Sequence, residues 1–228
     1  PAFRTGQREL AEAVYRAARA GRFLMAQAPT GIGKTVGTLF PLLRAMPPDA
    51  SRPGSGLDKV FYLAAKTPGR QLALDALQSL RAGLPQAPLR VLELVARDKA
   101  CEHPDKACHG ESCPLARGFY DRLSAARQAA VDAASAGLLA RERVRAVALQ
   151  HQVCPYYLAQ ELARWADVVV GDYNYWFDTS ALLFALTQMD GWRVAVLVDE
   201  AHNLVERARN MYSAELEQGA LRALRRSA

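Results

Sequence analysis

The chain lacks any apolar run long enough to cross a membrane. Val194–Val198 is among its longest such runs, whereas a spanning helix needs about 20 residues. It also lacks a secretory leader, and it begins at Pro1 instead of a methionine. We therefore expect a soluble part of a longer protein, without a membrane partner, in the cytoplasm of a bacterium and associated with its nucleoid.

Cysteine is scarce and confined to one window. The disulfides of a small secreted protein would be spread along the chain, so this distribution indicates reduced thiolates gathered around a metal. The spacing is C-x6-C-x4-C-x40-C, without the C-x2-C pair of most structural zinc sites. A proline follows the third and fourth cysteines, as in ferredoxin runs, so the residues alone leave iron–sulfur and zinc both open. The four cysteines are Cys101, Cys108, Cys113 and Cys154.

Acidic residues are fewer than basic ones, 23 against 29, and the formal net charge is +6. Such an excess suits a polyanionic partner, because contacts to phosphates release condensed counterions. Many soluble domains are mildly basic without such a partner, so charge alone does not decide for nucleic acid. Half of the residues are hydrophobic, which is enough for the core of one domain with a small insert.

Stretches of strand and helix character alternate along the chain, on both sides of an irregular, cysteine-rich segment at 98–114. This alternation predicts one parallel α/β sheet with helices on both faces and a mostly helical insertion. A Pro/Gly/Ser loop is expected at 47–57. Strands are predicted at 23–26, 59–64, 90–95, 167–170 and 194–198, and helices at 7–20, 36–46, 69–80, 115–136, 138–151, after Cys154 and after His202.

Residues 28–35, Ala-Pro-Thr-Gly-Ile-Gly-Lys-Thr, have the form of a phosphate-binding loop between a strand and a helix. Its glycines let backbone N–H groups curl around phosphates, and the helix that follows favours their charge. Lys34 would reach the β- and γ-phosphates, and Thr35 would place its hydroxyl on Mg²⁺. We favour this interpretation over a glycine-rich turn with a chance Lys-Thr pair. The predicted ATP-binding residues of the loop are Pro29, Thr30, Gly31, Ile32, Gly33, Lys34 and Thr35.

A second apolar strand ends on two adjacent carboxylates, Asp199 and Glu200, followed by Ala201 and His202. Open α/β sheets bind their ligands at this edge. Asp199 would hold Mg²⁺ through water, and Glu200 would orient and deprotonate the attacking water. Alone, the pattern would suit an acidic turn after a strand. Together with the glycine-rich loop it predicts an ATP-hydrolysing site with Lys34, Asp199 and Glu200 as catalytic residues.

The A-x-x-G-x-G-K-T form of the loop, with Ala28 where the generic pattern has glycine, and the later Asp-Glu-Ala-His resemble a superfamily 2 helicase. The 164 residues between Lys34 and Asp199 exceed a plain motor domain. Four cysteines in that interval, Val-Cys-Pro-Tyr-Tyr at 153–157, Ala-Asp-Val-Val-Val at 166–170 and Asn-Tyr at 174–175 resemble the XPD/DinG family of iron–sulfur DNA helicases. The resemblance implies a RecA-like first motor domain in two parts (1–97 and 159–205), an iron–sulfur insertion at 98–158, and a helical lead at 206–228 into an arch-like insertion.

The resemblance also implies an activity: ATP-driven movement along single-stranded DNA, 5′ to 3′, with Mg²⁺ and a 4Fe–4S cluster on Cys101, Cys108, Cys113 and Cys154. A second motor domain would supply an arginine finger, so the 228 residues alone should bind ATP weakly and hydrolyse it barely. The cluster is expected to staple a loop-rich insert, and a redox role stays open. The alternatives are a metal-stapled nucleic-acid-binding module that keeps the P-loop as a scaffold, and a redox sensor.

Further residues take roles by their position in the resemblance. Arg4 and Gln7 match a glutamine element ahead of the loop, in which Gln7 reads the adenine edge, although Gln7 would also suit an ordinary helix. His202 would couple the nucleotide site to the neighbouring motor domain. Lys66, Thr67 and Arg70 are placed to grip the DNA strand, although Lys66 and Arg70 would also suit a solvated helix start.

Aromatic residues gather after the fourth cysteine, and stacking of a base on such a ring contributes about 1–3 kcal/mol. An aromatic side chain near a strand end is more often part of the core, so Tyr173 and Tyr175 are only candidates for DNA contact. His103 and His109 lie in the cysteine-rich segment and could replace a ligand. Because four cysteines complete a site, we expect both histidines to be loop residues.

Overall fold

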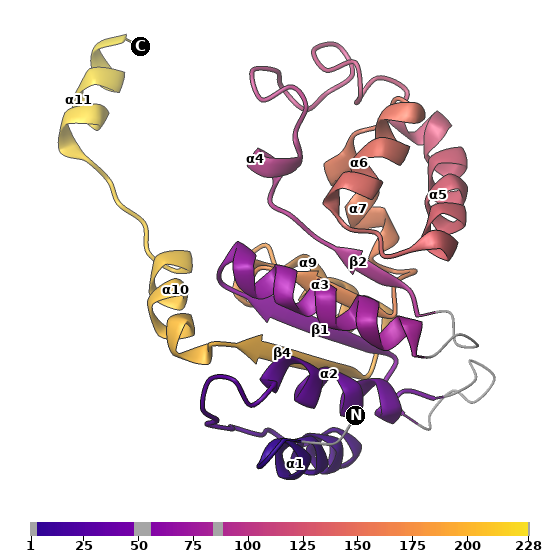
Figure 1. Ribbon diagram of the computed structural model, residues 1–228. Coiled ribbons are helices and arrows are strands. Elements are labelled where there is room, and N and C mark those ends of the chain that lie inside the picture. The colour runs from indigo at the N-terminus through magenta and orange to yellow at the C-terminus, as the bar shows by residue number, and fades with distance from the viewer. Residues whose placement is uncertain (1–3, 48–55, 84–88, 228) are drawn as a thin grey trace.

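The computed structural model describes residues 4–47, 56–83 and 89–227 and has a parallel β-sheet at its centre (Figure 1). In the described part the sheet has four strands in the order β2-β3-β1-β4. Val60 of β1 lies opposite Val168 of β3 on one side and Ala195 of β4 on the other. The strands are β1 (Lys59–Ala64), β2 (Val91–Glu93), β3 (Val168–Gly171) and β4 (Val194–Asp199).

Helices cover both faces of the sheet, as predicted, and a helical lobe rises from one end of it (Figure 1). No helix in the described ranges combines the length and apolarity needed to cross a membrane. The helices are α1 (Gln7–Ala20), α2 (Lys34–Ala45), α3 (Thr67–Ala82), α4 (Arg97–Ala100), α5 (Phe119–Ala136), α6 (Arg141–Gln150), α7 (Pro155–Leu162), α8 (Asn174–Phe177), α9 (Leu182–Asp190), the 3₁₀ turn η1 (Ala201–Asn203), α10 (Leu204–Met211) and α11 (Gln218–Ser227).

The central strand β1 is buried along its whole length because both of its faces pack on helices. Val60 and Tyr62 point into the core under α2 and α3, whereas Phe61 and Leu63 point into the opposite core. Successive side chains of a strand alternate between faces, so a strand covered on both sides is apolar throughout. The second core continues into the insertion, where α5, α6 and α7 pack together. The insertion therefore shares its core with the sheet.

One predicted strand is not formed. Residues 23–26 have no regular secondary structure, and the side chains of Phe23 and Met25 are fully exposed. In the described sheet β4 pairs with β1 alone, and residues 23–26 do not join its other edge. An extended segment becomes a strand only when a neighbouring strand forms hydrogen bonds with its N–H and C=O groups. An apolar run in the sequence does not show whether such a neighbouring strand is present. Most of the predicted loop at 47–57 lies outside the described residues.

A buried lysine, Lys59, lies at the start of β1, where the strands of the sheet begin. The ammonium of Lys59 donates hydrogen bonds to the carbonyl oxygens of Ala163 (3.3 Å), Arg164 (2.7 Å) and Ala166 (2.5 Å), where α7 turns into β3. It also lies 4.3 Å from the ring centre of Trp192. Burial lowers the pKa of Lys59 to about 8, because a charged amine loses its hydration inside the protein.

This shift predicts a pH-dependent stability. Between about pH 8 and pH 10 the unfolded chain keeps the Lys59 proton that the folded chain releases, so the free energy of unfolding should rise with pH in this window. Lys59→Met should remove a rise on the order of 2 kcal/mol. Urea unfolding across the window measures it, with Lys106→Met, at an exposed lysine, as the control. An unchanged pH dependence in Lys59→Met would contradict the assignment.

Candidate functional site

The glycine-rich loop turns sharply into α2. Gly31 and Gly33 both have φ of 84°, a conformation that side chains other than hydrogen strain. A Cβ on Gly33 would lie 2.5 Å from Nε2 of Gln7. Because α2 begins directly after Gly33, its unpaired N–H groups and the positive end of its dipole face the loop. This is the local structure that binds phosphates.

The loop and the end of β4 meet at the carboxyl edge of the sheet. Nζ of Lys34 lies 3.9 Å from Oε1 of Glu200 and donates a hydrogen bond to the carbonyl oxygen of Ala28 at 3.2 Å. The hydroxyl group of Tyr62, on the neighbouring strand β1, is hydrogen-bonded to the side chains of Thr35 and Asp199, and burial raises the pKa of Tyr62. The two segments with predicted catalytic residues therefore form one site.

The turn that follows β4 is held by contacts with Tyr173 and with its own side chains. Glu200 has φ of 52°, and its carbonyl oxygen accepts a hydrogen bond from Nδ2 of Asn203 at 3.0 Å. The hydroxyl of Tyr173 donates to the carbonyl oxygens of Asp199 and Glu200, the latter at 3.1 Å. Nδ1 of His202 lies 3.4 Å from Oε2 of Glu200. These contacts keep the Glu200 side chain on the same side as Lys34.

Arg4 and Gln7 contact the loop through its backbone. Nε2 of Gln7 donates to the carbonyl oxygen of Gly33 at 3.2 Å, and Oε1 of Gln7 accepts from the backbone N–H of Arg4 at 3.1 Å. The guanidinium of Arg4 donates to the carbonyl oxygen of Gly31. The structure thus places both residues of the predicted glutamine element beside the phosphate-binding loop.

The residues predicted to contact DNA divide into exposed and buried ones. Lys66 and Thr67 are exposed at the start of α3. Arg70 is 5% exposed and faces inward, where its Nη1 lies 3.8 Å from Oδ2 of Asp172. Its place on α3 explains this, since Arg70 shares one helix face with the buried Ala73, Leu74 and Leu77. A direct grip on DNA therefore fits Lys66 and Thr67 and does not fit Arg70.

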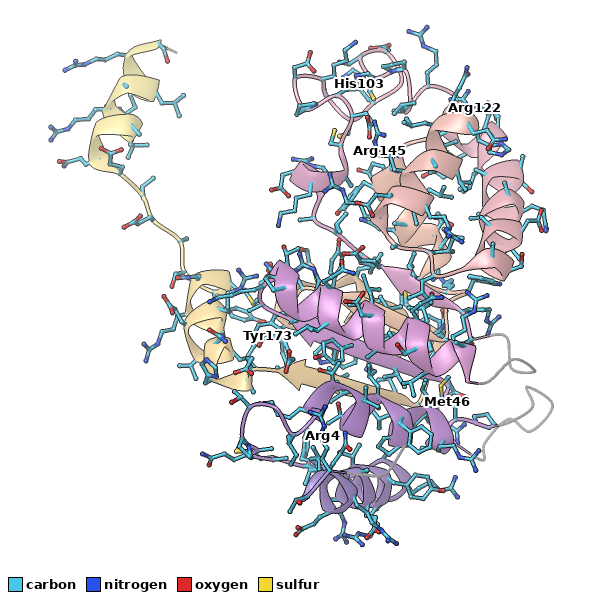
Figure 2. All side chains as sticks on the ribbon, viewed as in Figure 1. Arg4, Met46, His103, Arg122, Arg145 and Tyr173 are labelled. Carbon is cyan, nitrogen blue, oxygen red and sulfur yellow. The ribbon has the colours of Figure 1, made fainter. Side chains whose placement is uncertain are left out.

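The two candidate tyrosines also have structural contacts. Tyr173 is fully buried near α10 and β4 (Figure 2), and burial raises its pKa to about 12. The hydroxyl of Tyr175 donates to the carbonyl oxygen of Val95 at 2.8 Å, and burial raises its pKa too. Both rings pack in the core at the point where the chain leaves β3. The burial of Tyr173 argues against the predicted stacking on bases, because that ring has no free face.

The four cysteines of the insertion are free thiols. Cys154 precedes α7, where its sulfur accepts hydrogen bonds from the backbone N–H groups of Tyr156 and Tyr157. Burial raises the pKa of the Cys154 thiol, and the nearby Cys101 and Cys113 add to the rise. Within the described ranges, no three His, Cys, Asp or Glu residues are close enough to hold a single metal ion. Thiols free of disulfides are the type of ligand that an iron–sulfur cluster uses.

Two arginines of α6 hold the cysteine loop (residues 98–114) onto the helical lobe formed by α5, α6 and α7. The guanidinium of Arg145 forms two hydrogen bonds to the carboxylate of Glu102, at 2.6 and 2.7 Å. Arg141 donates to the carbonyl oxygen of Lys99 at 2.6 Å. Figure 2 shows Arg145 below the loop and His103 on it. His109 is exposed on the same loop, and His103 is partly exposed.

The family model described as DEAD_2 matches residues 77–221, which is more than half of the chain. The chain belongs to the DEAD_2 family. The matched part of this DEAD_2 chain contains the four cysteines and the Asp199–Glu200 turn, and the phosphate-binding loop precedes it.

Several curated relatives of the DEAD_2 chain are helicases by name. It is 27% identical over 217 residues to the "General transcription and DNA repair factor IIH helicase subunit XPD" of Arabidopsis thaliana, which covers 83% of this chain and 28% of the relative. It is 29% identical over 139 residues to a "Regulator of telomere elongation helicase 1 homolog" of Anopheles gambiae, with 56% and 14% covered. The chain therefore spans less than a third of the length of either relative.

Two solved structures have the same fold. A chain named "XPD_Helicase" matches with a TM-score of 0.60 at 20% identity over 90% of this chain and 34% of the other. A "Truncated XPD" matches with a TM-score of 0.55 at 22% identity over 86% and 52%. Together with the family match, these findings confirm the resemblance to XPD-like superfamily 2 helicases and the α/β motor fold.

Sequence reasoning missed one residue of this DEAD_2 site and an ion pair beside it. Tyr62 joins Thr35 to Asp199, but its position in an apolar strand made it look like a core residue. Asp172 and Arg207 pair across the carboxyl edge of the sheet. Asp172 directly follows the strand β3, and Asp199 is the last residue of β4, so a carboxylate at a strand end was the signal available in the sequence.

Proposed function

We propose that this chain binds ATP with Mg²⁺ and, within its full-length protein, drives 5′ to 3′ movement of a DNA helicase on single-stranded DNA. The observation that best supports the proposal is the meeting of Lys34 with Glu200 at 3.9 Å, beside Thr35 and Asp199 joined through Tyr62. A phosphate-binding loop used only as scaffold has no need of a carboxylate pair at the same place. DNA-helicase names among the relatives agree with the proposal.

Each group has a role in this site. The N–H groups of residues 31–35 hold the phosphates, and Lys34 neutralises the charge on the transferred one. Thr35 and Asp199 would hold Mg²⁺, which supplies further charge neutralisation on the phosphates. Glu200 orients the attacking water and accepts its proton. The Tyr173 hydroxyl fixes the backbone of that turn, so that Glu200 keeps its orientation.

The four cysteines would hold a second bound group, an iron–sulfur cluster, in addition to the nucleotide. Cys101, Cys108, Cys113 and Cys154 are proposed ligands of a 4Fe–4S cluster, which when bound would cross-link the irregular loop to α7. The loop has few apolar side chains of its own, so binding of the cluster and ordering of the loop share one free energy. Ion pairs such as that between Arg145 and Glu102 orient the loop toward this arrangement.

Other parts of the function depend on the rest of the protein. Lys66 and Thr67 are exposed beside the nucleotide site and are the proposed contacts to the DNA backbone. His202, next to Glu200, is proposed to couple the site to a second motor domain. That domain would contribute an arginine to the transferring phosphoryl group. The 228 residues alone should therefore hydrolyse ATP barely, and rapid DNA-stimulated hydrolysis by this chain would contradict the proposal.

Lys34→Ala in the full-length protein tests the proposal. Unwinding and DNA-stimulated ATP hydrolysis should fall by about a hundredfold or more, because the phosphates lose their main cation. Binding of single-stranded DNA, measured by fluorescence anisotropy, should stay near the wild-type value. The control is Lys106→Ala, at an exposed lysine of the cysteine loop. A wild-type protein that binds DNA but hydrolyses no ATP would instead favour a nucleic-acid-binding module.

A further inference from the structure

A carboxylate just after β3 is shared by arginines from two helices. Asp172 accepts a hydrogen bond from Arg207 of α10 on Oδ1, and its Oδ2 lies 3.8 Å from Nη1 of Arg70 of α3. Arg207 also donates to Oδ1 of Asn174 at 2.6 Å. Asp172 thus connects α3 and α10 on the side of the sheet where β1, β3 and β4 end (Figure 1).

The Arg70 end of this connection reaches the proposed DNA contacts. Nη2 of Arg70 donates to Oγ1 of Thr67 at 3.0 Å, and Thr67 is exposed next to Lys66. Arg70 itself is buried, and its Nε has no hydrogen-bond partner in the part of the chain that the structure describes. Its guanidinium is therefore held by Thr67 on the outer side and by Asp172 on the inner side.

The Arg207 end is linked to the nucleotide site through the chain. Arg207 lies in the first turns of α10, which follows Glu200 after the three residues of η1. The first turn of α3 touches the same site, since a Cβ on Gly69 would lie 3.3 Å from Oδ2 of Asp199. A shift of α3 therefore changes the surroundings of Asp199, and a shift of α10 moves the turn that contains Glu200.

The charges make Asp172 decisive for this arrangement. Two guanidinium groups share a single carboxylate in a mostly buried position, with 22% of the Asp172 side chain and 6% of the Arg70 side chain exposed. Loss of the carboxylate charge would leave two like charges near each other without compensation. An ion pair of this kind contributes little net stability because its charges lose their hydration, but removal of one partner leaves the other charge unpaired. Removal of the Asp172 charge should therefore disturb the placement of α3 and α10.

We propose that Asp172 is a positioning residue that couples the DNA-binding start of α3 to the turn with Glu200, through Arg70 and Arg207. The assignment rests on the proposed helicase function. DNA bound at Lys66 and Thr67 changes the hydrogen bond between Thr67 and Arg70. Asp172 then transmits the change to α10, and Glu200 moves with the start of that helix. Asp172 touches neither the nucleotide nor the DNA.

The test is Asp172→Asn in the full-length protein, because asparagine keeps the shape of the side chain and removes its charge. ATP hydrolysis at saturating single-stranded DNA should fall about tenfold, whereas the DNA-free rate and the KM for ATP should change by less than about twofold. Asp172→Glu, which keeps the charge, should restore most of the stimulation. Arg207→Gln should reproduce the loss, and the double variant should be no worse than either single one.

Asp167→Asn is the matched control. Asp167 precedes β3 as Asp172 follows it, and it forms an equivalent ion pair with Arg90 at the opposite edge of the sheet. This variant should lower the melting temperature and leave DNA stimulation unchanged. If Asp172→Asn does not fold, the partly exposed Arg207→Gln makes the same test.

Three outcomes would overturn the assignment. Equal losses of the DNA-free and DNA-stimulated rates in Asp172→Asn, or in Arg207→Gln, would show that the residue acts on the site as a whole. If Asp167→Asn and Asp172→Asn had equal effects on DNA stimulation, the role of Asp172 would be only to stabilise the fold. Absence of DNA stimulation in the wild-type protein would overturn the proposed function itself, and the two failures are thereby distinguished.

Discussion

Glu200→Gln should lower the rate of ATP hydrolysis by the full-length protein about 100- to 10,000-fold and leave ATP binding nearly unchanged. Glutamine has the shape of glutamate but cannot take up the proton of the attacking water. Binding should persist because Lys34, Thr35 and the loop N–H groups, which hold the phosphates, are untouched. The turn should persist as well, since its hydrogen bonds from Tyr173 and Asn203 end on backbone oxygens.

Single-turnover hydrolysis and fluorescent-nucleotide binding measure the two effects separately. The matched control is Glu206→Gln, at an exposed acid of α10 close to Glu200 in the chain. It should hydrolyse ATP at the wild-type rate. If Glu200→Gln lost ATP binding and hydrolysis in parallel, its role would be to hold Lys34, 3.9 Å away, and a different base would be needed.

Cys154→Ser should abolish the iron–sulfur cluster and loosen the cysteine-rich loop of the insertion. Cys154 is the proposed ligand at the start of α7, and its sulfur is already oriented by two backbone N–H groups. Without the cluster the loop between Cys101 and Cys113 keeps mainly surface ion pairs, such as that of Arg145 with Glu102, which contribute little stability. Because the free energy of cluster binding also orders the loop, loss of the cluster should leave the loop without its order.

Iron and acid-labile sulfide analysis, the brown colour of the protein and limited proteolysis within 98–158 report this loss. His109→Ala is the control, since His109 lies in the same loop and should keep the cluster and the protease resistance. ATP binding should survive in both variants, because Lys34 at the start of α2 and Asp199 at the end of β4 lie outside the insertion. A colourless wild-type protein that contains stoichiometric zinc would refute the iron–sulfur assignment.

Several elements were predictable because their signals are local. Helix α1 and strand β1 have the bounds that the sequence predicted, since an amphipathic period and a compact apolar run identify them without distant partners. The glycine-rich loop and the Asp199–Glu200 turn were recognised from residue types that phosphate and magnesium chemistry require. The likeness to XPD-like helicases was available from the same motifs and their order along the chain.

Other features depended on neighbours that the sequence does not identify. Residues 23–26 are apolar enough for a strand, yet a strand exists only where another offers its hydrogen bonds. Arg70 was predicted to contact DNA because it follows the second strand, at the place where the XPD/DinG family grips the single strand. Its spacing to Leu74 and Leu77 indicated the buried face of α3, and only the packing of α3 on the sheet showed that this face was inward.

The sequence by itself determined the chemistry of this protein: a phosphate-binding loop, a carboxylate pair and four thiols in one window, each specified by residue type and short spacing. Tertiary structure alone decided which groups touch. Tyr62 meets Thr35 and Asp199, and Asp172 joins Arg70 to Arg207, because the parallel strands end at one edge and bring distant segments together. Such contacts follow from strand order and register, which are long-range properties of the fold and leave no local pattern in the chain.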